Sequence, residues 1–279
     1  MRIGFVMQNQ GPGCVAQTST LAPALEAMGF ASLWATDHVV GVRAFEPHGY
    51  GAFWLEALTS LAFMAGQTKT IRLGPSVLVA PIRDPVYTAK ALATIDQLSG
   101  GRLSVAVGTG WSKAEFHALG RGDDHEARGK VTDETLELML RCWQGGTVDW
   151  AGERFTVRRA EFEPRPRQQP HPPLLIGGPF APPVMRRVKR FGDAWHPSTR
   201  DIVQLKADME RMNDFAERAV PVVNRLTFPE PPDDLELTRL IAGCAELGCV
   251  ETVVDLRPLT ADAAMAAAER ILHAYRTAA

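Results

Sequence analysis

The sequence predicts an α/β fold, a (β/α)8 TIM barrel, from two observations. Apolar runs rich in β-branched residues alternate with amphipathic helical segments, and they give about eight strand–helix pairs, the number that closes such a barrel. The stretch 70–111 holds one complete unit, a strand, a crossover helix and a second strand, which implies parallel pairing. A doubly wound open sheet is the alternative, although the glycine fingerprint of its first βα turn is absent.

The N-terminal half supplies the first four strands. The crossover helix begins with Asp84 as its N-cap and Pro85 as its first helical residue, and it ends at Gly100-Gly101. Pro23 leaves the start of the first helix undefined, because proline removes a helical hydrogen bond. The predicted elements are strands at 2–7, 31–36, 71–79 and 103–107, and helices ending at residue 29 and spanning 54–66 and 85–99.

The C-terminal half continues the alternation after a short helical turn at 112–119 and a polar stretch at 120–129. Residues 147–162 alternate around Ala151-Gly152, which predicts a small hairpin inserted outside the main repeat. The other predicted elements are helices at 132–143, 183–191, 201–218, 233–247 and 262–275, and strands at 174–176, 192–196, 220–226 and 250–256. No composition shift marks a boundary, so we expect a single domain over 1–279.

Composition indicates a protein of the cytoplasm. The formal net charge is −2, so no overall field attracts nucleic acid or an anionic membrane. No apolar run approaches the roughly 20 residues of a membrane-spanning helix, and the N-terminus MRIGFVMQNQ lacks the regions of a signal peptide. The four cysteines show no metal or redox spacing, so we expect reduced, structural thiols.

Polar residues and glycine turns follow several of the predicted strands. Parallel strands of a barrel end at one rim, where ligands bind. Glycine at a strand end lets a ligand approach the backbone, and the free N–H groups of a helix start can hold a phosphate. We therefore expect a site at this rim formed by Asp37, His38, Ser76, Val77, Gly108, Thr109, Gly110, Trp111, Gly177, Gly178, Trp195, His196 and Asp255.

Three other kinds of site find less support. Asp37, His38, His196 and Asp255 could meet around a metal, but no i,i+4 or CxxC spacing favours it, so a hydrolytic metal barrel is a minority interpretation. No GxSxG turn marks a serine nucleophile. The GTG run after the fourth strand lacks the third glycine of a dinucleotide-binding fingerprint.

Five segments resemble the bacterial-luciferase-like oxidoreductases: Asp37-His38, GPSVLVAPIRDP, LATIDQLSGGRLSVAVGTGW, PHPPLLIGG and GDAWHP. The resemblance is closest to the branch that uses the deazaflavin coenzyme F420, and it is clearest from Met1 to about His196. It implies a luciferase-like TIM barrel, a homodimer, and a flavin ring bound at the carboxyl-end rim.

The resemblance also implies roles for individual residues. Ser76–Val77 matches a non-prolyl cis peptide that forms a bulge behind the ring. Asp37 matches a residue beside the redox-active edge of the ring, and His38 matches an acid/base of some relatives, so these two are the predicted catalytic residues. Asp37 also joins the predicted cofactor-binding set, which is completed by Ser76, Val77, Gly108, Thr109, Gly110, Gly177, Gly178 and Pro179.

Trp111, Trp195 and His196 are the predicted substrate pocket. Relatives that oxidise sugar phosphates carry a carboxylate after the VGTG turn, where this chain has Trp111, which argues against the same substrate. The resulting hypothesis is an oxidoreductase that moves a hydride between F420 and a small organic molecule. An FMN-dependent monooxygenase on the same fold is the alternative, and a protein that holds a flavin or F420 without turnover is an alternative of another class.

Overall fold

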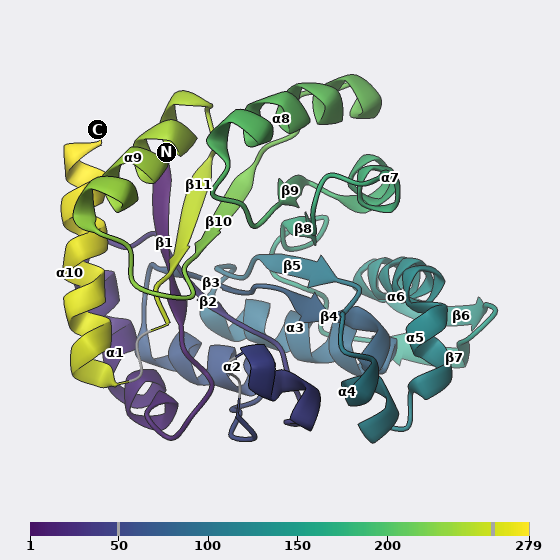
Figure 1. The fold of residues 1–279 in the computed structure, drawn as a ribbon. Coiled ribbons are helices and arrows are strands. Elements are labelled where there is room, and N and C mark those ends of the chain that lie inside the picture. The colour runs from purple at the N-terminus through teal and green to yellow at the C-terminus, as the bar shows by residue number, and fades with distance from the viewer. Residues whose placement is uncertain (49–50, 258–259, 279) are drawn as a thin grey trace.

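The computed structural model describes residues 1–48, 51–257 and 260–278, and it shows parallel strands surrounded by helices (Figure 1). One parallel sheet has the order β10-β11-β1-β2-β3, and a second has the order β4-β5-β8-β9. The strands are β1 (Arg2–Met7), β2 (Ser32–Ala35), β3 (Arg72–Pro75), β4 (Leu78–Val79), β5 (Val105–Gly108), β8 (Leu174–Gly177), β9 (Ala194–His196), β10 (Val223–Thr227) and β11 (Glu251–Asp255).

The two sheets are joined at both edges. Leu73 of β3 forms an isolated parallel bridge with Leu103, just before β5. At the other edge Trp195 bridges to Val222, and Ser198 bridges to Arg225 of β10. With β3 and β4 taken as one bent strand, the described residues give the eight parallel strands of the predicted barrel.

The third strand bends at the Ser76–Val77 peptide, which is cis as the resemblance implies. Before this bulge, β3 pairs with β2; after it, β4 pairs with β5. The single strand predicted over 71–79 is therefore two short strands, and the bulge between them faces the carboxyl ends of the neighbouring strands.

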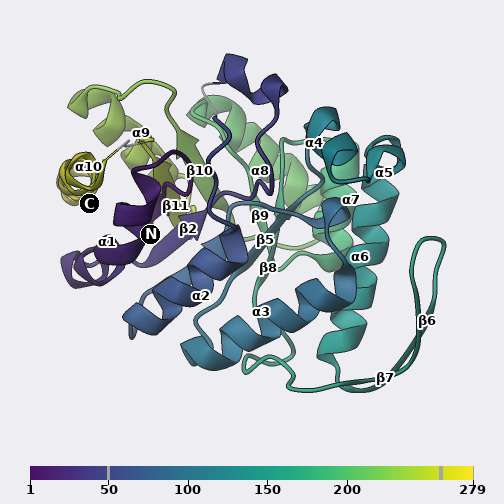
Figure 2. The ribbon, with the colours of Figure 1, turned by 90° about the horizontal axis from the view of Figure 1, so that it is seen from below.

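Helices cover the outside of the barrel, with α2 and α3 side by side and α10 beside α1 (Figure 2). The helices are α1 (Cys14–Met28), α2 (Ala57–Gln67), α3 (Pro85–Ser99), α4 (Lys113–Ala118), α5 (Gly122–Glu126), α6 (Arg128–Trp143), α7 (Pro182–Phe191), α8 (Ile202–Ala216), α9 (Asp234–Glu246) and α10 (Ala261–Thr277), with 3-10 turns η1 (Arg43–His48) and η2 (Ala80–Ile82). None of the helices in the described residues is both long enough and apolar enough to cross a membrane.

The predicted hairpin is present as β6 (Gly146–Ala151) and β7 (Thr156–Phe162), an antiparallel pair outside the barrel sheets. Figure 2 shows it projecting from the barrel beside α6. It lies away from the carboxyl-end rim, so it does not contribute to the site described below.

Two helical segments differ from the sequence prediction. The first helix begins at Cys14 and contains Pro23. Pro23 has no N–H to donate to the Ser19 carbonyl one turn earlier. Gln67 of α2 donates to this carbonyl instead, with 2.7 Å between its Nε2 atom and the Ser19 oxygen. The polar stretch 120–129 contains α5 and the start of α6. Its Arg121 pairs with Asp124, a contact that helical periodicity of apolar residues cannot reveal.

Strand alternation divides the core into two parts. Inside the barrel lies a small cluster that includes Val6, Trp34 and Ala106. The alternate strand residues, such as Phe5 and Met7, face outward into the larger core under the helices. Trp34 also stacks on the His196 ring, with the ring centroids 5.4 Å apart, and so lies beneath the rim.

Candidate functional site

A cavity of about 530 Å³ lies at the carboxyl ends of the strands. Every site residue predicted from the sequence except Trp195 lines it, together with several polar residues from the first and last strands. The predicted residues in its wall are Asp37, His38, Ser76, Val77, Gly108, Thr109, Gly110, Trp111, Gly177, Gly178, Pro179, His196 and Asp255. The expectation that these scattered segments meet at one rim is confirmed, whereas the role of each remains a prediction.

Trp195 is the exception, and strand alternation explains why. Ala194 faces the barrel interior and His196 lines the cavity, so Trp195 between them faces outward. It is buried in the core under the helices, where its indole N–H donates to the Gly178 carbonyl (3.0 Å). The prediction that Trp195 forms a pocket wall is therefore wrong.

Val77, at the bulge, fits between two strand-end glycines. A Cβ atom at Gly108 would lie 2.5 Å from Val77 Cγ2, and a Cβ atom at Gly177 would lie 2.5 Å from Val77 Cγ1. A larger residue at either position would therefore require Val77 to move. The glycines after β5 and β8 thus allow the bulge to occupy the centre of the rim.

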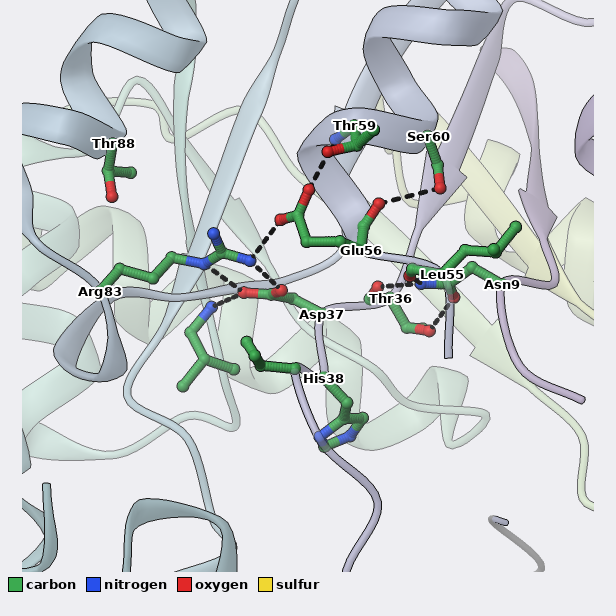
Figure 3. A network of polar contacts seen from close by, with 12 residues as sticks. Asn9, Thr36, Asp37, His38, Leu55, Glu56, Thr59, Ser60, Arg83 and Thr88 are labelled. Atoms are coloured by element: carbon green, nitrogen blue, oxygen red, sulfur yellow. Dashed lines mark hydrogen bonds and ion pairs between the residues drawn. The ribbon is translucent and has the colours of Figure 1, made fainter. Parts of the chain in front are cut away.

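The Asp37 carboxylate is fully enclosed beside the bulge. Its Oδ2 accepts the Val79 N–H (2.8 Å) and Arg83 Nε (3.0 Å), and its Oδ1 accepts the Arg83 Nη2 group. Figure 3 shows the carboxylate facing Arg83. Its side chain is 0% exposed, so Asp37 links the strand after the bulge to Arg83.

Arg83 binds a second carboxylate, that of Glu56 (2.7 Å). Glu56 also accepts the Thr59 N–H and so caps α2 (Figure 3). Burial alone would lower the pKa of the Arg83 guanidinium, but the charges and hydrogen bonds of Asp37 and Glu56 outweigh burial and raise it. Arg83 therefore stays a cation at the centre of a fixed network.

His38 points away from this network (Figure 3) and lines the cavity. Its Nδ1 lies 2.9 Å from Glu115 Oε2, while Glu115 Oε1 accepts the Val39 N–H (2.9 Å). Because a buried carboxylate accepts hydrogen bonds, the Nδ1 atom carries the proton in this pair. A carboxylate behind a histidine fixes both its tautomer and its ring orientation, as in acid/base sites.

Sequence reasoning missed Glu115, although a local signal was present. Ser112 and Glu115 have the S-x-x-E spacing of a capping box, and the Ser112 hydroxyl does accept the Glu115 N–H (3.2 Å). In a capping box the glutamate turns back to the N-cap; here it reaches His38 and Val39 instead. That long-range pairing is not visible in the spacing.

On the other side of the bulge, Ser76 is bound by His196 and Arg225. The Ser76 hydroxyl lies 2.8 Å from His196 Nε2, and His196 Nδ1 lies 2.6 Å from the Val223 carbonyl. Since a carbonyl only accepts, Nδ1 donates to it and Nε2 accepts from Ser76. Burial lowers the pKa of His196 to about 4, and the nearby Arg225 charge acts in the same direction, so this ring is neutral at pH 7.

Arg225 completes this second network. Its Nη1 donates to both the carbonyl and the hydroxyl of Ser76, and its Nη2 pairs with Asp255 Oδ2 (2.6 Å). Gln8 Nε2 donates to the other Asp255 oxygen (2.9 Å). Asp37, His38, His196 and Asp255, the residues of the minority metal interpretation, thus have separate partners. Within the described residues, no group of three or more His, Cys, Asp or Glu is arranged to hold a metal.

The Gly177-Gly178 turn is less open than the sequence suggests. The Gly178 N–H donates to the His196 carbonyl (3.3 Å), and α7 begins with Pro182 and Pro183, which have no N–H. Two basic residues of α7 pair with acidic partners: Arg187 with Asp133 and Arg190 with Glu137. Phosphate binding by the glycine pair remains a prediction.

Comparison with known sequences shows which protein family this chain belongs to. A sequence profile of the luciferase-like monooxygenases matches residues 1–229. The chain belongs to this family. One luciferase-like relative is an uncharacterized protein of Mycobacterium tuberculosis (strain ATCC 25618 / H37Rv), 31% identical over 221 residues, which are 78% of this chain and 75% of that protein.

Two further luciferase-like relatives carry names of oxidoreductases with different cofactors. F420-dependent glucose-6-phosphate dehydrogenase of Amycolatopsis mediterranei is 30% identical over 202 residues, 71% of this chain and 58% of that protein. FMNH2-dependent dimethylsulfone monooxygenase of Pseudomonas putida is 33% identical over 132 residues, 47% of this chain and 36% of that protein.

Solved structures agree with the luciferase-like fold. The monooxygenase RslO1 from Streptomyces bottropensis superposes with a TM-score of 0.78 at 20% identity, over 99% of this chain and 100% of that one. The coenzyme F420-dependent tetrahydromethanopterin reductase from Methanopyrus kandleri gives 0.76 at 16% identity, over 98% and 99% of the two chains. At these identities the likeness concerns the fold alone.

Proposed function

We propose that this protein is an oxidoreductase that transfers a hydride between coenzyme F420 and a small organic substrate. The observation that carries the proposal is the rim cavity built over the Ser76–Val77 bulge, with Val77 at its base and the glycine ends of β5 and β8 on either side. Because Gly108 and Gly177 have no side chains, the surface beside Val77 has room for a flat ring. The F420-dependent relative also matches more of this chain than the FMNH2-dependent one, 71% against 47%.

The protein's own residues would bind and orient, while the cofactor carries the chemistry. When bound, F420 supplies two-electron hydride transfer and reacts poorly with oxygen. Val77 would support the ring, and Gly108, Thr109, Gly110, Gly177, Gly178 and Pro179 would form the wall along it.

We assign different roles to the two predicted catalytic residues. His38, held by Glu115 at the cavity wall, is the group that would move a proton to or from the substrate. Asp37, with both oxygens bound by Arg83 and Val79, would act as a positioning residue that holds the strand after the bulge. We also propose one domain, a homodimer and a cytoplasmic location, on the strength of the family resemblance.

An FMN-dependent monooxygenase is the second candidate, and the 33% identity to the Pseudomonas putida enzyme favours it. The Ser76–Val77 bulge would support either ring.

Cofactor titration tests the proposal. Purified protein would be titrated separately with F420 and with FMN, each oxidised and reduced, while cofactor fluorescence is followed. We expect micromolar or tighter binding of F420, and a substrate-dependent loss of the reduced or oxidised form in a panel of ketones and alcohols. Binding of FMN only would favour the monooxygenase, and tight F420 binding without any turnover would favour a carrier protein.

A further inference from the structure

An aromatic wall stands beside His38 in the cavity. The His38 ring centroid lies 4.5 Å from that of Phe45, 4.7 Å from that of Trp54 and 6.2 Å from that of Trp111. Phe45 and Trp111 also contact each other, at 5.4 Å between centroids. Of these four rings, His38, Trp54 and Trp111 line the cavity and are called the aromatic wall, and Phe45 packs behind them.

The wall is preformed and partly open. Phe45 is fully buried behind it, and the Trp54 indole N–H is fixed on the Gly51 carbonyl (2.9 Å). Trp111, in contrast, is 49% exposed at the cavity rim. Exposed aromatic surface beside a polar group is the usual make-up of a small-molecule site.

Charge is arranged differently in the rest of the cavity. Its described lining contains two arginines, Arg225 and Arg257, which belong to β10 and to the segment after β11. Arg225 is paired with Asp255, and Asp255 also accepts the Arg257 backbone N–H (3.2 Å). The charged group that contacts His38 is instead an anion, the carboxylate of Glu115.

We propose that the substrate which meets His38 is an uncharged molecule with a flat, apolar or aromatic body and a carbonyl or hydroxyl group for the histidine. This inference rests on the proposed function and names its substrate class. A ring would stack on Trp111 and Trp54, in the geometry that aromatic pairs prefer. A phosphate or carboxylate beside His38 would lose its hydration and would be repelled by the Glu115 carboxylate.

A matched pair of probes tests the substrate class. Acetophenone and 4-acetylbenzoate share a ring and a ketone and differ by one negative charge. Each would be titrated calorimetrically into the protein saturated with oxidised F420, where no turnover occurs, and into the protein without cofactor. We expect acetophenone to bind at least about tenfold more tightly than 4-acetylbenzoate.

Variants then locate the binding. Trp111→Ala should weaken acetophenone about tenfold or more, whereas Trp150→Ala, in the hairpin outside the barrel, should leave its affinity unchanged. Equal or tighter binding of 4-acetylbenzoate, binding of neither probe, or no effect of Trp111→Ala would overturn the inference. Failure of F420 itself to bind would instead overturn the proposed function, because the probe titrations without cofactor still report on the aromatic wall.

Discussion

The Ser76–Val77 bulge is held from two sides, and the two sides use different chemistry. After the bulge, the Val79 N–H is bound by an ionised carboxylate that is itself bound by Arg83. Before it, Ser76 lies between a neutral imidazole, that of His196, and the Arg225 guanidinium. The first side is an enclosed ion-pair network, and the second depends on the protonation state of one buried ring.

The different chemistry of the two sides suggests that each side of the bulge responds to a different perturbation. The ion-pair side should be sensitive to loss of a partner, because an unpaired buried charge is costly. The imidazole side should be sensitive to pH, because a proton on His196 Nε2 would remove the acceptor that the Ser76 hydroxyl uses. Breaking each side separately tests the comparison.

The largest effect is expected on the ion-pair side. Arg83→Leu leaves the enclosed Asp37 carboxylate without its cation and should lower the free energy of unfolding by about 3–5 kcal/mol, measured by urea denaturation. Arg190→Ala breaks an ion pair in which the arginine is 60% exposed, so it should cost less than about 1 kcal/mol. Similar losses in the two variants would contradict the assignment of Asp37 as an enclosed structural anion.

A smaller effect is expected on the imidazole side, and only in acid. The pKa of His196 is about 4 in the folded protein, against about 6.5 in an unfolded chain. Between these values the unfolded state binds more protons, so the free energy of unfolding falls as pH falls from about 6.5 to 4, by up to about 3 kcal/mol. Above this window the contribution is fully present.

The His196→Asn variant isolates this contribution from that of the carboxylates. Asparagine can still donate to the Val223 carbonyl but does not titrate in this range. The difference in unfolding free energy between the parent protein and the variant should shrink as pH falls from about 6.5 to 4. Parallel stability curves for the two proteins would show that His196 is not buried in its neutral form.

The sequence was sufficient to predict what depends on chain order and periodicity. The strands end at one rim because they are parallel, so Asp37, Gly108 and Gly177 line one cavity as expected. The bulge at Ser76–Val77 was predicted through the family resemblance, since no local pattern requires a cis peptide there.

What the sequence could not give was the choice of partner across the barrel. Arg83 and Glu115 belong to residue types that are common on protein surfaces, so the sequence does not mark them as site residues. The fold places Arg83 against Asp37 and Glu115 against His38. Trp195 was assigned to the pocket from its position at a strand end alone. Side chains alternate between the two faces of a strand, and this alternation turns Trp195 outward. A strand end predicts the rim, but the side-chain direction decides which residue faces the ligand.

The central claim, that Val77 supports the cofactor ring between glycine strand ends, is tested most directly by the dissociation constant for F420 in two alanine variants. In Gly177→Ala the new Cβ meets Val77 Cγ1 at 2.5 Å, whereas in Gly66→Ala, in helix α2, nothing lies within 4 Å of it. We predict that Gly177→Ala stays folded but binds F420 at least about tenfold more weakly, a change of about 1.4 kcal/mol, while Gly66→Ala binds it as the parent protein does. Unchanged affinity in folded Gly177→Ala would contradict the claim.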